Sequence, residues 1–352
     1  RGMDSQMSII HSWLLNLAYV AVLVVCSPWI VWTAVRKGKY REGFAARLLG
    51  NVPLREGDRP CVWIHAVSVG EVNLLGTTID RIHERLPDCQ IVVSTTTKTG
   101  FNLATRKYAD LSVFYCPLDF SWAVDRAMRR VRPTLLVLAE LELWPNLIAA
   151  AKLHGAKVAV INGRLSDNSF RGYGRVRPLV EGVLRQIDLI AAQNKETADR
   201  FRALGAANVH VTGSLKFDGA ETDRRNAKTQ ALRQLAQFAD DDIVWLAGST
   251  QAPEEQMALD IYERVKRDCP RLRLVIVPRH PERFDEVADL LDRNGTPWIR
   301  RTELDTDRCG HRTSDSRLLL VDTIGELGAW WGTAEIAFVG GSFGDRGGQN
   351  ML

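Results

Sequence analysis

The chain has 352 residues, a length typical of two domains. Hydrophobic residues make up 45% of it and charged residues 25%, a globular composition that excludes a mainly disordered chain. The net charge of +4 is too small to predict nucleic acid as a partner.

The first predicted element is an apolar helix. Between Ser5 and Val35 there is no Asp, Glu, Lys or Arg, and residues 13–32 are nearly all apolar. A membrane-spanning helix needs about 20 such residues, and the tryptophans near both ends of this run would lie at the two interfaces. We therefore predict a membrane anchor over residues 1–35.

The residues after this run set its expected orientation. Residues 36–59 form a basic juxtamembrane segment, which the positive-inside rule places on the cytoplasmic side. The rest of the chain would then lie in the cytoplasm, against an anionic leaflet. A signal peptide fits poorly, because its charges would precede the apolar run. A buried core helix stays open as an alternative, since Asn16 and Pro28 interrupt the stretch.

After Pro60 the pattern changes to short β-branched runs that alternate with amphipathic stretches. Apolar runs without alternation suit strands that are buried on both faces, as in parallel sheets. The runs predicted as strands are 61–67, 90–95, 134–139, 157–162, 189–193 and 209–213. This series predicts a doubly wound α/β domain, Rossmann-like, over residues 60–218.

The series restarts after a charged, helix-like segment at about 219–241. The strands predicted there are 243–248, 272–278, 298–300, 317–322 and 335–341. They indicate a second Rossmann-like domain over residues 219–352, which we expect to be incomplete at its C-terminus. Two such domains are expected to face a cleft into which the carboxyl ends of their strands point.

The candidate site residues follow strands, and the first is Glu71. Ser68-Val-Gly-Glu71 fits the capping box S-x-x-E, which would explain both polar residues as a helix start. The same position would place a carboxylate at the lip of the cleft, where a general base needs to lie. The sequence leaves both interpretations open.

Further charged residues follow later strands of the first half. Glu140 and Glu142 come directly after a strand, either as a helix start or as functional acids that need partners. Lys216 lies between apolar neighbours after the last strand. It is either a surface lysine with its stem on apolar groups or a cation for an anionic ligand.

In the second half, Gly-Ser-Thr at 248–250 is a weak signal for phosphate binding. Arg279 directly follows a strand and is well suited to a phosphate. The sequence contains no Walker loop, no GxGxxG fingerprint and no Cys/His cluster, so it predicts no metal site.

Taken together, these strings resemble a known family. HAVSVGE, ELELWPN, NGRLS, GY at 172–173, TGSLKFD, GST, PRHPERF, DTIGEL and AFVGGS occur in this order. They resemble the 3-deoxy-D-manno-oct-2-ulosonic acid (Kdo) transferases of lipopolysaccharide and lipid A biosynthesis, over essentially the whole chain. The resemblance implies a GT-B fold: two Rossmann-like domains and an N-terminal membrane-anchor helix.

The resemblance also implies an activity. It is an inverting, metal-independent transfer of Kdo from CMP-Kdo to a lipid A precursor, at the cytoplasmic face of the inner membrane. The implied partners are CMP-Kdo, the lipid A precursor and inner-membrane lipid, with no nucleic acid and no cofactor.

Residue by residue, the resemblance implies roles. Glu71 matches the catalytic base, and Glu140 and Lys216 match positions assigned to transition-state stabilisation. The positions that match CMP-binding segments are Pro278, Arg279, Ile324, Gly325, Glu326, Asn350, Met351 and Leu352.

The chain departs from the family pattern in two places. Leu141 stands where the family usually has threonine, and the sequence stops at Leu352, before a glutamate expected as a nucleotide ligand. Two alternatives therefore stay open: another GT-B nucleotide-sugar glycosyltransferase that uses a UDP donor, and an inactive membrane-anchored fragment.

Overall fold

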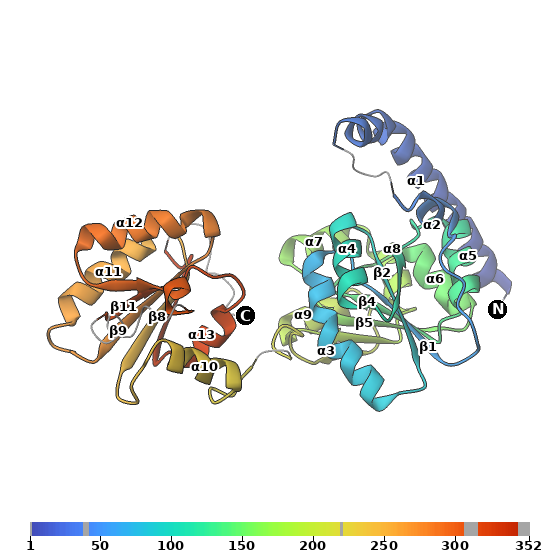
Figure 1. Ribbon diagram of the computed structural model, residues 1–352. Helices are drawn as coiled ribbons and strands as arrows, with labels where there is room; N and C mark the ends of the chain where they lie inside the picture. The colour runs from blue at the N-terminus through green and yellow to red at the C-terminus, as the bar shows by residue number, and fades with distance from the viewer. Residues whose placement is uncertain (1, 38–41, 219–220, 306–315, 344–352) are drawn as a thin grey trace. The chain divides into compact units, whose positions relative to one another are not determined.

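The computed structural model describes residues 2–37, 42–218, 221–305 and 316–343. The chain divides into two compact units, Arg1–Gly219 and Ala220–Leu352. Each unit is an α/β domain built on a parallel sheet of its own (Figure 1).

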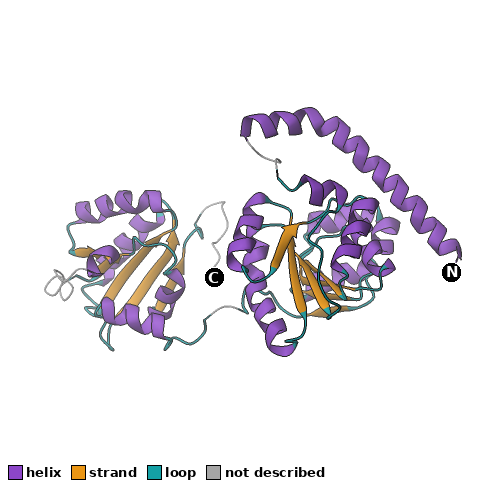
Figure 2. Cartoon of the chain, turned by 45° about the vertical axis from the view of Figure 1, so that its right-hand side comes forward, coloured by secondary structure: helices purple, strands orange, loops and turns teal. Residues whose placement is uncertain are grey.

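The first unit contains a seven-stranded parallel sheet in the order β3-β2-β1-β4-β5-β6-β7 (Figure 2). Its strands are β1 (Cys61–His65), β2 (Gln90–Thr95), β3 (Ser112–Tyr115), β4 (Leu135–Ala139), β5 (Lys157–Gly163), β6 (Leu189–Ala192) and β7 (Val209–Val211). The sequence pattern did not predict β3. This strand has four residues and lies at the edge of the sheet, and only its last two are buried, so it lacks a long apolar run.

Helices cover both faces of this sheet. They are α1 (Gly2–Lys37), α2 (Phe44–Leu49), α3 (Val69–Arg85), α4 (Lys98–Lys107), α5 (Ser121–Val131), α6 (Pro145–Leu153), α7 (Asp167–Arg175), α8 (Arg177–Leu184) and α9 (Lys195–Ala203). Successive residues of a strand point to opposite faces. In β1, Trp63 packs in one apolar cluster with α5 and α6, and Ile64 packs in another with α3 and α4. The first unit is therefore doubly wound, as predicted.

The predicted anchor segment lies within α1, which runs through Pro28 without a break. Among the residues that the structure describes, no helix is both long enough and apolar enough to cross a bilayer. The structure thus does not confirm the membrane anchor. It does show α1 in contact with α5 (Figure 1), and the side chain of Asn16 is buried there.

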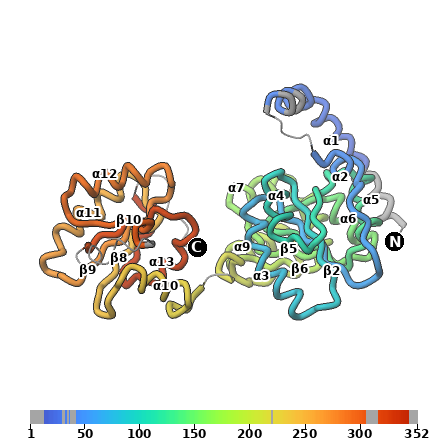
Figure 3. The backbone as a smooth tube through the Cα atoms, viewed as in Figure 1, coloured from blue at the N-terminus to red at the C-terminus, as the bar shows by residue number. Residues whose placement is uncertain are grey.

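The second unit contains a five-stranded parallel sheet in the order β10-β11-β9-β8-β12. Its strands are β8 (Ile243–Thr250), β9 (Leu272–Pro278), β10 (Trp298–Arg300), β11 (Leu318–Leu320) and β12 (Ile336–Val339). Its helices are α10 (Ala227–Leu235), α11 (Glu254–Val265), the 3-10 turn η1 (Pro281–Arg283), α12 (Phe284–Asn294), the 3-10 turn η2 (Arg301–Asp305) and α13 (Leu327–Thr333). All five strands predicted for this half are present. The charged segment before them contains α10, which lies beside α13 (Figure 3).

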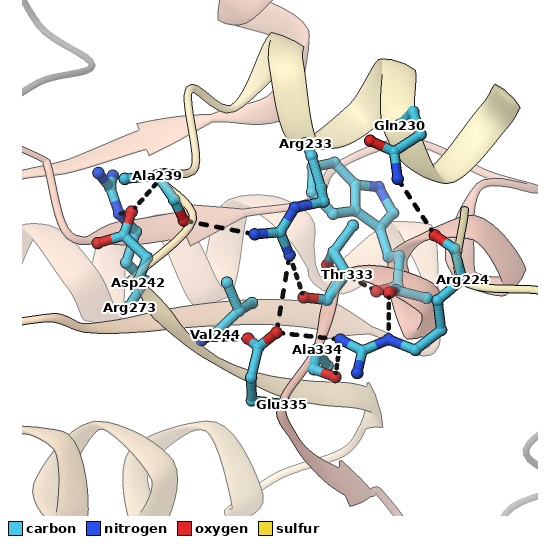
Figure 4. A network of polar contacts seen from close by, with 12 residues as sticks. Arg224, Gln230, Arg233, Ala239, Asp242, Val244, Arg273, Thr333, Ala334 and Glu335 are labelled. Carbon is cyan, nitrogen blue, oxygen red and sulfur yellow. Dashed lines mark hydrogen bonds and ion pairs between the residues drawn. The ribbon is translucent and has the colours of Figure 1, made fainter. Parts of the chain in front are cut away.

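A polar network ties this helix pair to the sheet (Figure 4). Arg224 donates to the carbonyl oxygen of Ala334 at 2.8 Å and pairs with Glu335 at 3.0 Å. The Glu335 carboxylate also accepts from the backbone N–H of Val244, in β8, at 2.8 Å, and Arg233 of α10 lies 3.7 Å from it. These bonds hold the start of the second unit against its first strand.

Candidate active site

The strand order brings two predicted motifs together. β1 and β4 are hydrogen-bonded neighbours, with His65 opposite Leu138, although they are far apart in the sequence. The chain order reverses between them, and open parallel sheets bind ligands at this topological switch point. HAVSVGE follows β1 and ELELWPN follows β4, so both motifs lie at the carboxyl ends of this strand pair.

Glu71 forms the capping box that the sequence predicted. Ser68 accepts from the backbone N–H of Glu71 at 3.2 Å, and its hydroxyl donates to Glu71 Oε1 at 2.8 Å. The backbone N–H of Val67 donates to Glu71 Oε2 at 2.8 Å, and the residue is 8% exposed. A carboxylate can accept about four hydrogen bonds, so each oxygen keeps acceptor capacity beyond these bonds. The helix-start role is confirmed, and the role as a base stays a prediction.

Glu140 ends the neighbouring strand in an unusual conformation. Its φ is 59°, in the left-handed region that residues with side chains rarely adopt, and such outliers cluster at functional sites. A 2.9 Å bond from its N–H to Ile161 O holds this turn against β5. Burial raises the pKa of Glu140, the charge of Glu71 raises it further, and Arg164 and Lys216 act in the opposite direction. The structure thus brings the three predicted catalytic residues into one electrostatic group.

Glu142, the second acid that the sequence offered after β4, belongs to the same group, although the family resemblance assigned it no role. Burial raises the pKa of Glu142 to about 7, and the charges of Glu71 and Glu140 add to this effect. The indole N–H of Trp144 donates to its Oε2 at 2.8 Å and acts in the opposite direction. A carboxyl that titrates near neutral pH beside two other acids is a frequent feature of active sites.

Two further residues were missed, Arg164 and Tyr173. Arg164 acts on Glu140, and the phenol pKa of Tyr173 is raised by burial and by the charge of Glu142. Both lie in strings of the family resemblance, NGRLS and GY, which was the available signal. Neither stood out from spacing alone, because Arg164 follows β5 as a single charged residue and Tyr173 lies within α7.

The loop that carries Lys216 is fastened to the end of β5. Asn162 is buried, and its Oδ1 accepts from the backbone N–H of Leu215 at 3.1 Å and from the hydroxyl of Ser214 at 3.3 Å. Lys216 itself is exposed, and its charge acts on Glu140. This coupling favours the interpretation of Lys216 as a cation that faces the site.

In the second unit the predicted donor residues lie at strand ends. Pro278 is the buried last residue of β9, and Arg279 follows it in an exposed position. Ile324 is 79% exposed, and Gly325 has a φ of 90° in the turn after β11. The structure thus places these four residues at or just after the carboxyl ends of β9 and β11, two neighbouring strands.

Glu326 is already engaged within the second unit. Arg301 forms a two-pronged ion pair with it, at 2.9 Å to each carboxylate oxygen. The hydroxyl of Thr323 donates to Oε2 at 2.8 Å. Glu326 therefore organises the turn before α13. The three remaining donor predictions, Asn350, Met351 and Leu352, lie outside the described residues.

Glu254 is a buried acid that the sequence did not reveal. β8 and β12 form the switch point of the second sheet, and Glu254 begins α11 directly after β8. Only 2% exposed, it accepts from the backbone N–H groups of Gln251 at 2.9 Å, Gly341 at 2.9 Å and Ser342 at 3.1 Å. One carboxylate thus joins the loops that follow the two strands. Within the described part of the chain, no cluster of three or more His, Cys, Asp or Glu side chains could hold a metal ion.

Comparison with known proteins identifies the family. The family model of 3-deoxy-D-manno-octulosonic-acid transferase (kdotransferase) matches residues 39–219, slightly more than half of the chain. The 3-deoxy-D-manno-octulosonic acid transferase of Haemophilus influenzae is 34% identical over 346 residues, which cover 95% of this chain and 78% of that protein.

Solved structures are similar in part. The C-terminal CMP-Kdo binding domain of WaaA from Acinetobacter baumannii is 33% identical, with a TM-score of 0.32, over 36% of this chain and 64% of that chain. The UDP-GlcNAc 2-epimerase of Neisseria meningitidis, bound to UDP-GlcNAc, is 13% identical, with a TM-score of 0.50, over 79% of this chain and 76% of that chain. The second likeness is one of fold alone.

The predicted fold class, α/β of the GT-B type with two Rossmann-like units, is confirmed by the two parallel sheets and by this likeness of fold. The relative from Haemophilus influenzae extends the match beyond the first unit to nearly the whole chain. The chain belongs to the 3-deoxy-D-manno-octulosonic-acid (Kdo) transferase family, and it is a glycosyltransferase.

Proposed function

We propose that this enzyme moves Kdo from CMP-Kdo to a lipid A precursor, with inversion at the anomeric carbon and without a metal or cofactor. Family membership supports the Kdo group, and a relative described as a CMP-Kdo binding domain supports the donor. The observation that carries the proposal is the group of acids Glu71, Glu140 and Glu142 at the switch point of the first sheet, with the charge of Lys216 acting on Glu140.

In the proposed reaction, Glu71 accepts the proton of an acceptor hydroxyl as that oxygen attacks the anomeric carbon of Kdo. The bond from this carbon to the phosphate oxygen breaks, and CMP leaves with the electron pair. The bonds from Val67 and Ser68 hold the Glu71 carboxylate in one orientation before the acceptor arrives. Glu140 and Lys216 would stabilise charge that develops in the transition state, with Lys216 opposite the Kdo carboxylate or the departing phosphate.

The donor would be held by the second unit. We assign this role to Pro278, Arg279, Ile324, Gly325 and Glu326, and to Asn350, Met351 and Leu352 beyond the described residues. The Arg279 guanidinium suits the phosphate of CMP, because it offers several N–H donors in a plane. Glu326 would act mainly through the turn that its ion pair with Arg301 holds in place.

We also propose that the enzyme works at the cytoplasmic face of the inner membrane. The acceptor is an anionic lipid that stays in the bilayer, and α1 exposes large apolar side chains such as Trp13 (70%), Leu17 (66%) and Val25 (79%). Exposure of so many large apolar side chains to water is unfavourable, whereas their burial in lipid would be favourable. The basic segment after it would face the anionic leaflet.

Two substitutions separate the two roles of Glu71. Glu71→Gln keeps an acceptor oxygen for the helix start but cannot take a proton, so we expect transfer to fall by about a hundredfold or more. Ser68→Ala removes the cap and keeps the carboxylate, so it should cost about 1 kcal/mol of stability and retain most of the transfer.

The measurement is transfer of radiolabelled Kdo from CMP-Kdo to the lipid precursor, with urea unfolding of each variant in parallel. Substantial transfer by the Glu71→Gln variant would remove Glu71 as the base. No transfer by the parent enzyme would favour the inactive-fragment alternative.

A further inference from the structure

Asn16 is a buried amide within the apolar stretch of α1. It is 4% exposed, whereas Leu17 beside it is 66% exposed, so α1 turns this amide toward the protein. Asn16 Oδ1 accepts from the backbone N–H of Ser121 at 3.0 Å, and its Nδ2 donates to the Ser121 hydroxyl at 2.7 Å. A buried amide is costly unless it is hydrogen-bonded, so this pairing favours a single docked position of α1 on the start of α5.

Tyr19 makes the second polar contact of the same helix face. It lies three residues after Asn16, a spacing that places both side chains on one side of a helix. Its hydroxyl donates to Asp119 Oδ2 at 3.1 Å, and its ring meets Phe120 edge to face with centroids 6.0 Å apart. α1 therefore bonds to Asp119, in the turn before α5, and to Ser121, the first residue of α5.

Asp119 also bonds to α6, and so links α1 to that helix. The helix begins after Trp144 without a side-chain cap of its own. The Asp119 carboxylate supplies one from outside, because it accepts from the backbone N–H groups of Asn146 at 3.0 Å and Leu147 at 2.8 Å. The Asn146 amide donates to Asp119 O at 2.6 Å and lies 3.5 Å from Asn16 Oδ1.

These five residues, Asn16, Tyr19, Asp119, Ser121 and Asn146, form what we name the α1 junction. Three of them, Asn16, Asp119 and Asn146, are at most 4% exposed. Asn146 is the last residue of ELELWPN, so the junction touches the motif that carries two candidate carboxylates.

The loop 140–144 is thus held at both ends. At its start, the strained Glu140 is bonded to β5, and at its end the first turn of α6 is bonded to the α1 junction. The position of Glu142 between these two points depends on both. We propose that Asn16 and Tyr19 are positioning residues, and that docking of α1 arranges the loop 140–144 for transfer. The N-terminal helix would then be part of the scaffold of the site, beyond any role in membrane attachment.

The proposal rests on the proposed function, since transfer is one of its readouts. Asn16→Leu removes the docking bonds and leaves α1 at least as apolar as before. Tyr19→Phe removes a single hydroxyl. Ser27→Ala is the matched control, because it removes an exposed polar group of the same helix, whose hydroxyl bonds only within α1.

Kinetics are measured with CMP-Kdo and lipid precursor in detergent micelles, so that attachment to a bilayer is not needed. We expect Asn16→Leu to lower kcat by about tenfold or more, as for a small misplacement of reacting groups, with an unchanged KM for CMP-Kdo. Tyr19→Phe should show a smaller fall in kcat, and Ser27→Ala none. A parental kcat in Asn16→Leu would overturn the proposal.

Hydrogen exchange gives a readout that does not depend on activity. In Asn16→Leu, the amides of residues 140–148 should exchange faster, while those of β1 and of the second unit keep their rates. Faster exchange throughout the first unit would indicate a merely structural role and would contradict the proposal. If Asn16→Leu fails to fold, Tyr19→Phe supplies the same two readouts. If the parent transfers nothing, the proposed function fails while the exchange result still decides whether the junction positions the loop.

Discussion

The Glu71 carboxylate caps the start of its helix, and its role as a base is our proposal. The bonds from Ser68 and Val67 explain why S-x-x-E in the sequence predicts a helix start. Nothing within that motif says that the charge of Glu71 acts on Glu140, because Glu71 lies in α3, after β1, and Glu140 follows β4. The local S-x-x-E motif therefore predicted the helix cap, and only the tertiary structure showed that Glu71 acts on other acids.

Glu142 provides a prediction at the scale of one residue. Burial raises its pKa from an ordinary 4.5 to about 7. Between these two pH values Glu142 is protonated in the folded protein and ionised in the unfolded chain. The free energy of unfolding of the parent therefore falls as the pH rises through this range. Glu142→Gln stays neutral at every pH. Its melting temperature relative to the parent should therefore rise between pH 4.5 and 7 and level off above it.

The measurement is thermal unfolding of both proteins over this pH range. Glu282→Gln, in which an exposed acid of the second unit is changed, is the control and should show no such trend. A melting difference for Glu142→Gln that does not change with pH would mean that the carboxyl titrates at its ordinary pKa.

At the scale of elements, both sheets place loops at the point where the strand order reverses. In the first unit these loops follow β1 and β4, and in the second they follow β8 and β12. In the second unit, the Glu254 carboxylate lies at this point and accepts hydrogen bonds from the loop after β12. The sequence predicted β8 and β12 correctly, but not that they are neighbours, since strand order depends on contacts between distant segments.

The bonds of Glu254 lead to a prediction about the loops that follow β8 and β12. Glu254→Ala removes the acceptor of several backbone N–H groups, and the buried one at Gly341 alone should cost about 1–3 kcal/mol, so the second unit should unfold at clearly lower urea concentration. Glu254→Gln keeps one strong acceptor oxygen and should show a smaller loss. Glu282→Ala, at an exposed position two residues after His280, should change stability by less than about 0.5 kcal/mol. Equal stability of Glu254→Ala and the parent would show that the loops are held by other contacts.

At the scale of the whole molecule, the two units carry different parts of the proposed reaction. The family model covers the first unit, and the likeness to a Kdo transferase extends over both. A ligand that binds only the folded state stabilises it, by about 2.7 kcal/mol at a concentration one hundred times its Kd. CMP should therefore raise the melting temperature of the full chain, whereas UDP at equal concentration should raise it less.

Arg279→Ala should weaken this effect of CMP, because it removes the guanidinium proposed for the phosphate. Arg271→Ala is a suitable control, since Arg271 is an exposed arginine that precedes β9 and pairs with Asp241 at 3.4 Å. Stronger stabilisation by UDP than by CMP would favour the alternative of a UDP-dependent glycosyltransferase.

The sequence by itself determined the alternation of strands and helices, the capping box at Ser68 and Glu71, and the family. These depend on local periodicity and on motifs of a few residues, which a single chain displays directly. It did not determine β3, which has four residues of which only the last two are buried and so gives little periodic signal. Only the tertiary structure decided that Glu140, Arg164 and Lys216 share one electrostatic group, and that Asn16 reaches Asn146 across 130 residues of sequence. The physical reason is that strand order and helix docking arise from packing between distant segments, which no local pattern encodes.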